Sequence, residues 1–176
     1  MGESLILRSD FMSMCLRELV EFHEQFIKMI LQRTGDLKPQ MIYELDGKSV
    51  ATVFMGDFRT GILNVFDSLR GKSISWLITM NEAYEDVFQC RDMSKDDMER
   101  RLSTYSPGVL QKRFESGDKS VKEVILMNVY TKDIKLSMTY DKDMKKLRQT
   151  ENFEGLLAVS DLDRLSWSSS GLEGQK

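Results

Sequence analysis

The clearest periodic pattern of the chain lies near its N-terminus. From Phe11 to Leu31, apolar residues recur at helical spacing and polar residues fill the positions between them. Ser9 or Asp10 is suited to cap the start of this helix, because its side-chain oxygen can accept a free N–H of the first turn. Gly35 follows the pattern and is suited to end the helix in a left-handed conformation. The pattern therefore predicts one long amphipathic helix.

The apolar side of this predicted helix is wide, covering about half of the circumference at 100° per residue. Its members are Phe11, Met12, Cys15, Leu16, Leu19, Val20, Phe22, Phe26, Ile27, Met29, Ile30 and Leu31. One sheet face needs a narrower apolar stripe. We therefore expect the helix either to lie deep between layers, or to pack on its own sheet while also contacting a second subunit.

A β-hairpin and a second helix are expected next. The β-rich runs 41–45 and 48–54 are separated by Asp46-Gly47, a pair that tolerates the positive φ angles of a type I′ turn. Apolar residues between Ile62 and Leu69 then predict a shorter helix, and Gly71 is placed to terminate it.

The remaining strands are predicted in the middle and the C-terminal half of the chain. The run 73–84 is rich in branched and aromatic residues and suits a buried central strand. The runs 121–130 and 134–140 alternate apolar and polar residues, as a half-buried antiparallel pair does. A charged stretch follows at 141–148, and 153–159 is expected to form a short strand or helix.

These elements predict an α+β fold. We expect an antiparallel sheet of about five strands, with the long N-terminal helix and the second helix packed against one face of it. Residues 1–165 are expected to form one domain. Within it, the polar residues 89–120 form a surface excursion or a lid, and the serine- and glycine-rich residues 166–176 are predicted to be a flexible tail.

Composition excludes little but favours a protein of the cytoplasm. The chain has 176 residues and a net charge of -3. No apolar run approaches the roughly 20 residues of a membrane span, and the N-terminus lacks the pattern of a secretory signal. Its two cysteines, Cys15 and Cys90, are expected to be reduced thiols. We therefore expect a cytoplasmic location and no membrane partner.

The charge balance argues against nucleic acid as a partner, because the chain has 25 basic and 28 acidic residues. Basic residues gather at 100–101, 112–113 and 142–148, but each group is mixed with acidic residues. Such mixed groups of basic and acidic residues are typical of an ordinary solvent-exposed surface and do not require a bound nucleic acid. We rank nucleic-acid binding last among the functions considered.

No motif for phosphate or metal binding is recognisable. Gly-Lys-Ser occurs at 47–49 and 71–73, but neither follows the glycine spacing of a phosphate-binding loop. His23, the single histidine, points into the apolar side of the first helix, whereas Glu21 and Glu24 point away from it. We expect a histidine of the core or of an interface, with one hydrogen-bonded nitrogen, and we predict neither a metal nor a cofactor.

The strongest candidates for chemistry are Glu82, Glu85 and Asp86. They follow the predicted central strand and enter the 89–120 segment, and carboxylates there could bind a metal or act as an acid–base pair. Exposed strand ends are also commonly acidic for no functional reason. Cys90 beside Arg91 is a weaker candidate, because a neighbouring cation can lower the pKa of a thiol.

Two functional hypotheses follow from these patterns. The first is a non-enzymatic binding or assembly module, a homo-oligomer joined through the N-terminal helix, which could also bind a protein partner. The second is a small metal-dependent or acid–base enzyme that uses Glu82, Glu85 and Asp86, with residues 89–120 as its lid. The wide apolar side of the first helix favours the first hypothesis.

Overall fold

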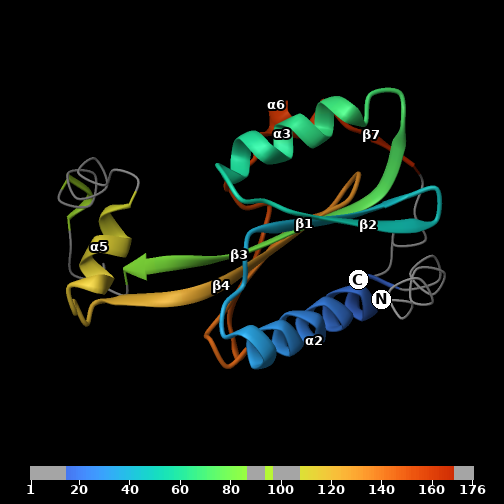
Figure 1. Ribbon diagram of the computed structural model, residues 1–176. Helices are drawn as coiled ribbons and strands as arrows, with labels where there is room; N and C mark the ends of the chain where they lie inside the picture. Colours follow the sequence, from blue (N-terminus) through green and yellow to red (C-terminus); the bar gives the residue numbers. More distant parts are fainter. Residues whose placement is uncertain (1–14, 87–93, 97–107, 169–176) are drawn as a thin grey trace.

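The fold is an antiparallel sheet with helices on both faces (Figure 1). The computed structural model describes residues 15–86, 94–96 and 108–168. Its elements are α2 (Leu16–Thr34), β1 (Gln40–Leu45), β2 (Lys48–Val53), α3 (Phe58–Ser68), β3 (Ser73–Asp86), α5 (Val109–Glu115), β4 (Val121–Tyr130), β5 (Lys135–Tyr140), β6 (Lys146–Glu151), α6 (Val159–Leu162) and β7 (Ser166–Trp167). The predicted α+β class is confirmed.

The sheet is built around β3, its longest strand. The strand order is β2-β1-β3-β4-β5-β6, and each neighbouring pair is antiparallel. The short β7 pairs in parallel with the start of β3. Beyond the body of the sheet, β3 and β4 continue together as a two-stranded arm, and α5 packs near its tip (Figure 1).

The two long helices lie on opposite faces of the sheet, and the expectation that both would cover one face is wrong. The reason is that β3 is apolar on both of its faces. Trp76 and Ile78 point toward α2, and Leu77 points toward α3. A strand that is apolar on both faces needs cover on both, and one helix supplies each cover.

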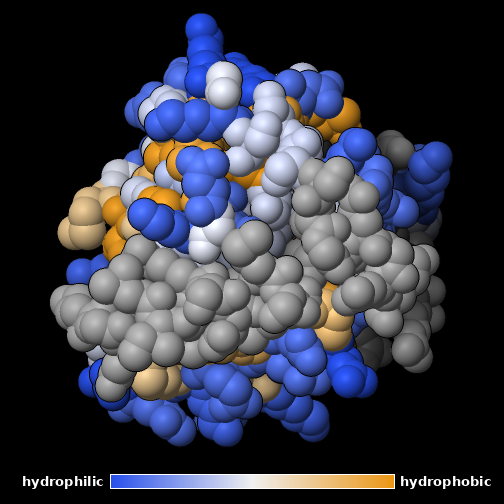
Figure 2. Space-filling model, turned by 90° about the vertical axis from the view of Figure 1, so that its right-hand side faces the viewer, coloured by the Kyte–Doolittle hydropathy of each residue, from blue (hydrophilic) through white to orange (hydrophobic). Residues whose placement is uncertain are grey.

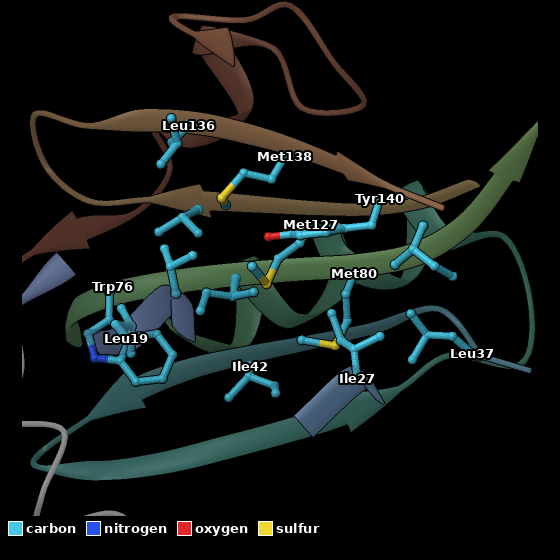
Figure 3. Packing of buried hydrophobic residues seen from close by; sticks show 14 residues of the cluster. Leu19, Ile27, Leu37, Ile42, Trp76, Met80, Met127, Leu136, Met138 and Tyr140 are labelled. Carbon is cyan, nitrogen blue, oxygen red and sulfur yellow. The ribbon is translucent and has the colours of Figure 1, made fainter. Parts of the chain in front are cut away.

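The face covered by α2 holds the larger core cluster (Figure 3). Its buried members are Leu19, Val20, Ile27, Leu37, Ile42, Trp76, Ile78, Met80, Ile125, Met127, Val129, Leu136, Met138 and Tyr140. They come from α2, from the four strands β1, β3, β4 and β5, and from Leu37 in the segment between α2 and β1. The described helices, α2 included, contain no segment long and apolar enough to cross a membrane.

Local signals at the ends of α2 agree with the expected helix. Gly35 has a φ of 79° and donates its N–H to the Leu31 carbonyl, as predicted for a left-handed cap. At the N-terminal end, the carboxylate of Glu18 accepts the N–H of Cys15 at 3.3 Å. The predicted caps Ser9 and Asp10 lie outside the described residues.

The predicted hairpin turn is confirmed by its backbone angles. Asp46 and Gly47 have φ values of 52° and 75°, which are the two positive angles of a type I′ turn. β1 and β2 pair directly on either side of it, with Leu45 opposite Lys48.

On the other face, α3 and α6 cover a second core cluster. It contains Met41, Tyr43, Ile62, Phe66, Leu69, Ile74, Leu77, Tyr130, Phe153, Leu157 and Leu165. Asp161 connects the two helices, because it accepts the Ala158 N–H at 2.9 Å and two hydrogen bonds from Arg59 at 3.0 and 3.1 Å. The run 153–159, expected to form a short strand or helix, contributes Phe153 and Leu157 to this core and leads into α6.

Two strands arise where the sequence indicated none. The charged segment 146–151 forms β6, whose residues are all exposed. It joins the sheet through its backbone, so it has no apolar alternation to reveal it. The segment 166–168 begins the predicted tail but is attached to β3, since Ser168 donates its N–H to the Ile74 carbonyl at 2.9 Å. Much of the predicted 89–120 excursion lies outside the described residues.

A close approach at Gly61 gives a first prediction. A Cβ atom added to Gly61, inside α3, would overlap the ring of Phe54, which also packs on Phe58 at 5.5 Å between ring centroids. We expect Gly61→Ala to lower the free energy of unfolding by about 1–3 kcal/mol, although alanine is normally favoured in a helix. Urea unfolding measures it, with Asn64→Ala at an exposed position of α3 as the control. A stabilised Gly61→Ala would contradict this packing.

Candidate functional site

The three candidate carboxylates do not converge. Successive residues of a strand point to opposite faces, and this separates them. Glu82 and Asp86 lie on the α2 face of the β3–β4 arm, in phase with Met80 of the α2-side core. Glu85 lies on the opposite face. Each of the three carboxylates has a separate basic partner.

Glu82 is held by two donors from distant parts of the chain. Its Oε1 atom accepts a hydrogen bond from Lys142 Nζ at 2.6 Å and another from the Leu37 backbone N–H at 2.7 Å. Burial alone would raise the pKa of Glu82, but these hydrogen bonds outweigh it and lower the pKa below its ordinary value. Glu82 therefore connects β3 to the segment after α2 and to the segment after β5.

A second carboxylate shares the same cation. Glu123 of β4 lies 3.4 Å from Lys142 Nζ, and burial together with the neighbouring Glu82 raises the pKa of Glu123. Burial opposes the charge of Lys142, yet the two carboxylates raise the pKa of its ammonium group. Lys142 thus stays protonated between Glu82 and Glu123.

Asp86 belongs to a different network, at the tip of the arm. Arg113 of α5 donates to Asp86 at 3.0 Å and to Asp118 at 2.8 Å. Two hydrogen bonds from Ser120, followed by the bond from Arg113, lower the pKa of Asp118 to about 2. Tyr84 and Phe114 pack beside this network with ring centroids 5.2 Å apart. The network fixes α5 against the end of β3.

Glu85 forms an ion pair with Arg148 of β6 on the opposite face. About half of the Arg148 side chain is exposed, so solvent screens this pair. The pair lies across the sheet from Glu82 and contributes nothing to the same site.

The chemistry open to Glu82 and Asp86 is restricted by these partners. A general acid near neutral pH needs a raised pKa, whereas Glu82 has a lowered one. A metal site needs several carboxylate, histidine or thiolate ligands in one place. Among the described residues no such group of three or more is present. Glu82 and Asp86 each connect separate parts of the chain through these contacts.

His23 is a buried histidine, as the helical pattern indicates. Its side chain is 1% exposed, and its Nδ1 atom donates to the Leu19 carbonyl at 2.8 Å. Its ring packs edge-on against Trp76, with centroids 5.5 Å apart. Burial lowers the pKa of His23 to about 4, against the smaller opposing effect of the Leu19 hydrogen bond. The ring is therefore neutral at pH 7.

A buried carboxylate at the other end of the sheet escaped the sequence reasoning. Glu44 of β1 is buried and accepts hydrogen bonds from Trp76 Nε1 at 3.0 Å and from the Ser75 hydroxyl at 3.1 Å. Ser75 also contacts Ser168 at 3.0 Å. The signal was present, because Glu44 occupies an inward position in the β-rich run 41–45, where it is the one charged residue. Its contacts connect β1, β3 and the segment after β7.

The cysteines divide between described and undescribed parts of the chain. Cys15 is a free thiol at the start of α2. The candidate pair Cys90 and Arg91 lies outside the described residues.

Comparison of the chain with protein-family models, curated proteins and solved structures found no match. The proposals below therefore rest on the geometry of this molecule.

The single histidine allows a direct test of the α2-side core. The ¹H NMR signal of the His23 ring should titrate near pH 4 in the folded protein, because burial disfavours its charged form. In urea it should titrate near pH 6.5. As the pH falls, the unfolded chain therefore takes up a proton on His23 before the folded chain does. Stability should therefore fall by roughly 3 kcal/mol at most between pH 6.5 and 4. A folded-state pKa near 6.5 would contradict this burial.

The structural role of Glu82 is tested by a pair of matched variants. Glu82→Gln should lower the free energy of unfolding by about 1–2 kcal/mol at pH 7, because it removes a charge-assisted hydrogen bond in a partly buried cluster. Glu85→Gln removes the same charge from an exposed pair and should cost less than about 0.5 kcal/mol. Urea unfolding measures both.

The acid limb of the same experiment has a defined sign. The folded-state pKa of Glu82 is lowered, so its contribution is present at neutral pH and is lost as the pH falls through that value. The difference between wild type and Glu82→Gln should shrink in acid. Equal effects of the two variants at pH 7 would overturn the distinction between Glu82 and Glu85.

Proposed function

We propose that this chain is a non-enzymatic binding or assembly module that forms a homodimer. The observation that carries the proposal is an apolar surface on the α2 side of the sheet. We call it the α2–β2 surface and define it by Phe26 and Met29 of α2 together with Ala51 and Val53 of β2.

The rotation of α2 about its own axis determines which of its flanks carries Phe26 and Met29. Glu24 points toward the β5–β6 side of the sheet, where it accepts a hydrogen bond from Tyr140 at 2.8 Å and lies 3.4 Å from Lys146. Phe26 and Met29 lie on the other flank of the helix, where Phe26 packs against the α2-side core and Met29, further from the buried positions of α2, points more toward solvent. Ala51 of β2 lies opposite Ile42 of the α2-side core and shares its face.

The α2–β2 surface remains partly open to solvent. Met29 is 40% exposed and Val53 is 51% exposed, while Phe26 is half-buried. Figure 2, seen from the side of the β1–β2 turn, shows a largely polar surface in which apolar side chains gather mainly toward the α3 end. Single exposed apolar residues are ordinary, but neighbouring ones on two elements favour a contact surface. Covering them would contribute about 25 cal/mol for each Å² of apolar area.

Charges on the β5–β6 side of the sheet support a protein partner over nucleic acid. Basic side chains that could bind phosphates are engaged within the chain: Lys142 with Glu82, Lys146 with Glu24, and Arg148 with Glu85. Each would have to give up an acidic partner to bind a phosphate. The cytoplasm remains the location we propose.

The enzyme hypothesis has one supporting observation, the two carboxylates that share Lys142. A thermal-shift screen with divalent metals addresses it, because a metal bound to the native state must raise the melting temperature. A rise that disappears in Glu82→Gln would favour this second function.

The proposed homodimer is tested by a substitution within the α2–β2 surface. Wild-type protein should sediment as a dimer at micromolar concentration. Met29→Glu should shift it to monomer, raising the dissociation constant at least tenfold, because a charge would be buried in an apolar contact. Gln25→Glu adds the same charge to an exposed position on the polar side of α2 and should remain dimeric.

Sedimentation across a hundredfold range of concentration, with the melting temperature of each variant, completes the test. A wild-type monomer throughout this range would overturn the homodimer. Equal dissociation by Met29→Glu and Gln25→Glu would remove the α2–β2 surface from the contact.

A further inference from the structure

We infer that two copies of this chain join edge to edge through β2, which extends one antiparallel sheet across a two-fold axis at Ala51. The inference rests on the proposed homodimer and specifies how the second copy docks. It begins from the position of β2, which ends the sheet and pairs only with β1 in the part of the chain that the structure describes.

The hairpin determines which backbone groups of β2 face outward. Leu45 and Lys48 flank a two-residue turn, so they form a hydrogen-bonded pair, and such pairs recur at every second position. The bond from the Phe54 N–H to the Pro39 carbonyl, at 2.9 Å, continues this alternation beyond the strand. The N–H and C=O groups of Ser49, Ala51 and Val53 therefore point to the open edge.

These three residues define a self-complementary register. Antiparallel pairing of two such edges places Ala51 opposite the partner's Ala51, and Ser49 opposite the partner's Val53. Each outward N–H then meets an outward carbonyl, giving about six backbone hydrogen bonds across the junction. A second copy supplies the same spacing of donors and acceptors by symmetry.

Charge permits this pairing on the β2 edge. Lys48 is the one charged residue in β2. In the proposed register the two Lys48 residues lie roughly 20 Å apart, beyond the Debye length of about 8 Å at physiological salt. The opposite edge strand, β6, carries Lys146 and Arg148, both engaged with acidic residues of their own chain. Charged edge strands of this kind resist addition of another strand.

Apolar cover adds to the backbone pairing. Val53, the last residue of β2, is 51% exposed, and Met55, two residues beyond the strand, is 83% exposed. A two-fold axis perpendicular to the sheet leaves the α2–β2 surfaces of both copies on the same face. The α2–β2 surfaces of the two copies then adjoin across the junction. Val53 lies opposite Ser49 of the partner subunit and loses part of its exposed area.

Position-specific cross-linking tests the register. In protein carrying Cys15→Ser and Cys90→Ser, Ala51→Cys should form a disulfide-linked dimer under mild oxidation, because paired Cα atoms would lie about 5.5 Å apart. Lys48→Cys, roughly 20 Å from its mate, should remain unlinked. Equal linking at both positions would indicate random collision and overturn the register.

A backbone variant separates this inference from the homodimer itself. Ala51→Pro removes an outward N–H that β1 does not use, and it should raise the dissociation constant at least tenfold with the β1–β2 pairing retained. Ala51→Ser keeps the N–H and should remain dimeric. A dimeric Ala51→Pro whose melting temperature matches Ala51→Ser would overturn the β2 junction but leave the homodimer standing. A monomeric wild type would overturn both.

Discussion

The pairing of β3 with β4 is the interaction on which the other parts of the structure depend. The two strands pair continuously from Leu77 with Tyr130 to Asp86 with Val121. Their first half lies between α2 and α3 and supplies side chains to both core clusters. Their second half leaves the helices and carries α5 (Figure 1). One long antiparallel ladder therefore holds the two cores and the arm in a fixed arrangement.

Charged residues extend this arrangement where apolar cover ends. Glu82 and Lys142 join the arm to the segments that follow α2 and β5, and Arg113 joins α5 to Asp86. Partly buried pairs of this kind cost desolvation energy, which hydrogen bonds and mutual attraction offset. The surface that we propose for a partner is apolar and includes the opposite edge strand of the sheet, β2.

The candidate site shows how far sequence reasoning reaches. Glu82, Glu85 and Asp86 lie close together in the sequence, so a local pattern reveals them as a group. Because side chains alternate between the two faces of a strand, the same pattern already places Glu85 on the face opposite Glu82 and Asp86. Their partners Lys142, Arg148 and Arg113 are distant in sequence, so no local pattern connects them. Glu44 was visible as a polar residue in an apolar strand, but its bond to Trp76 requires β1 and β3 to be aligned.

Local patterns were enough for the helix α2 with its Gly35 cap, for the Asp46-Gly47 turn and for the α+β class, because each depends on neighbours within a few residues. Tertiary structure decided which face each helix covers, and it recruited the charged β6 and the short β7 into the sheet. It also set the rotation of α2 that buries Leu19, Val20 and Ile27 and leaves Met29 exposed. These outcomes depend on pairing between distant segments, and the backbone hydrogen bonds of such pairing can form whatever side chains the segments carry.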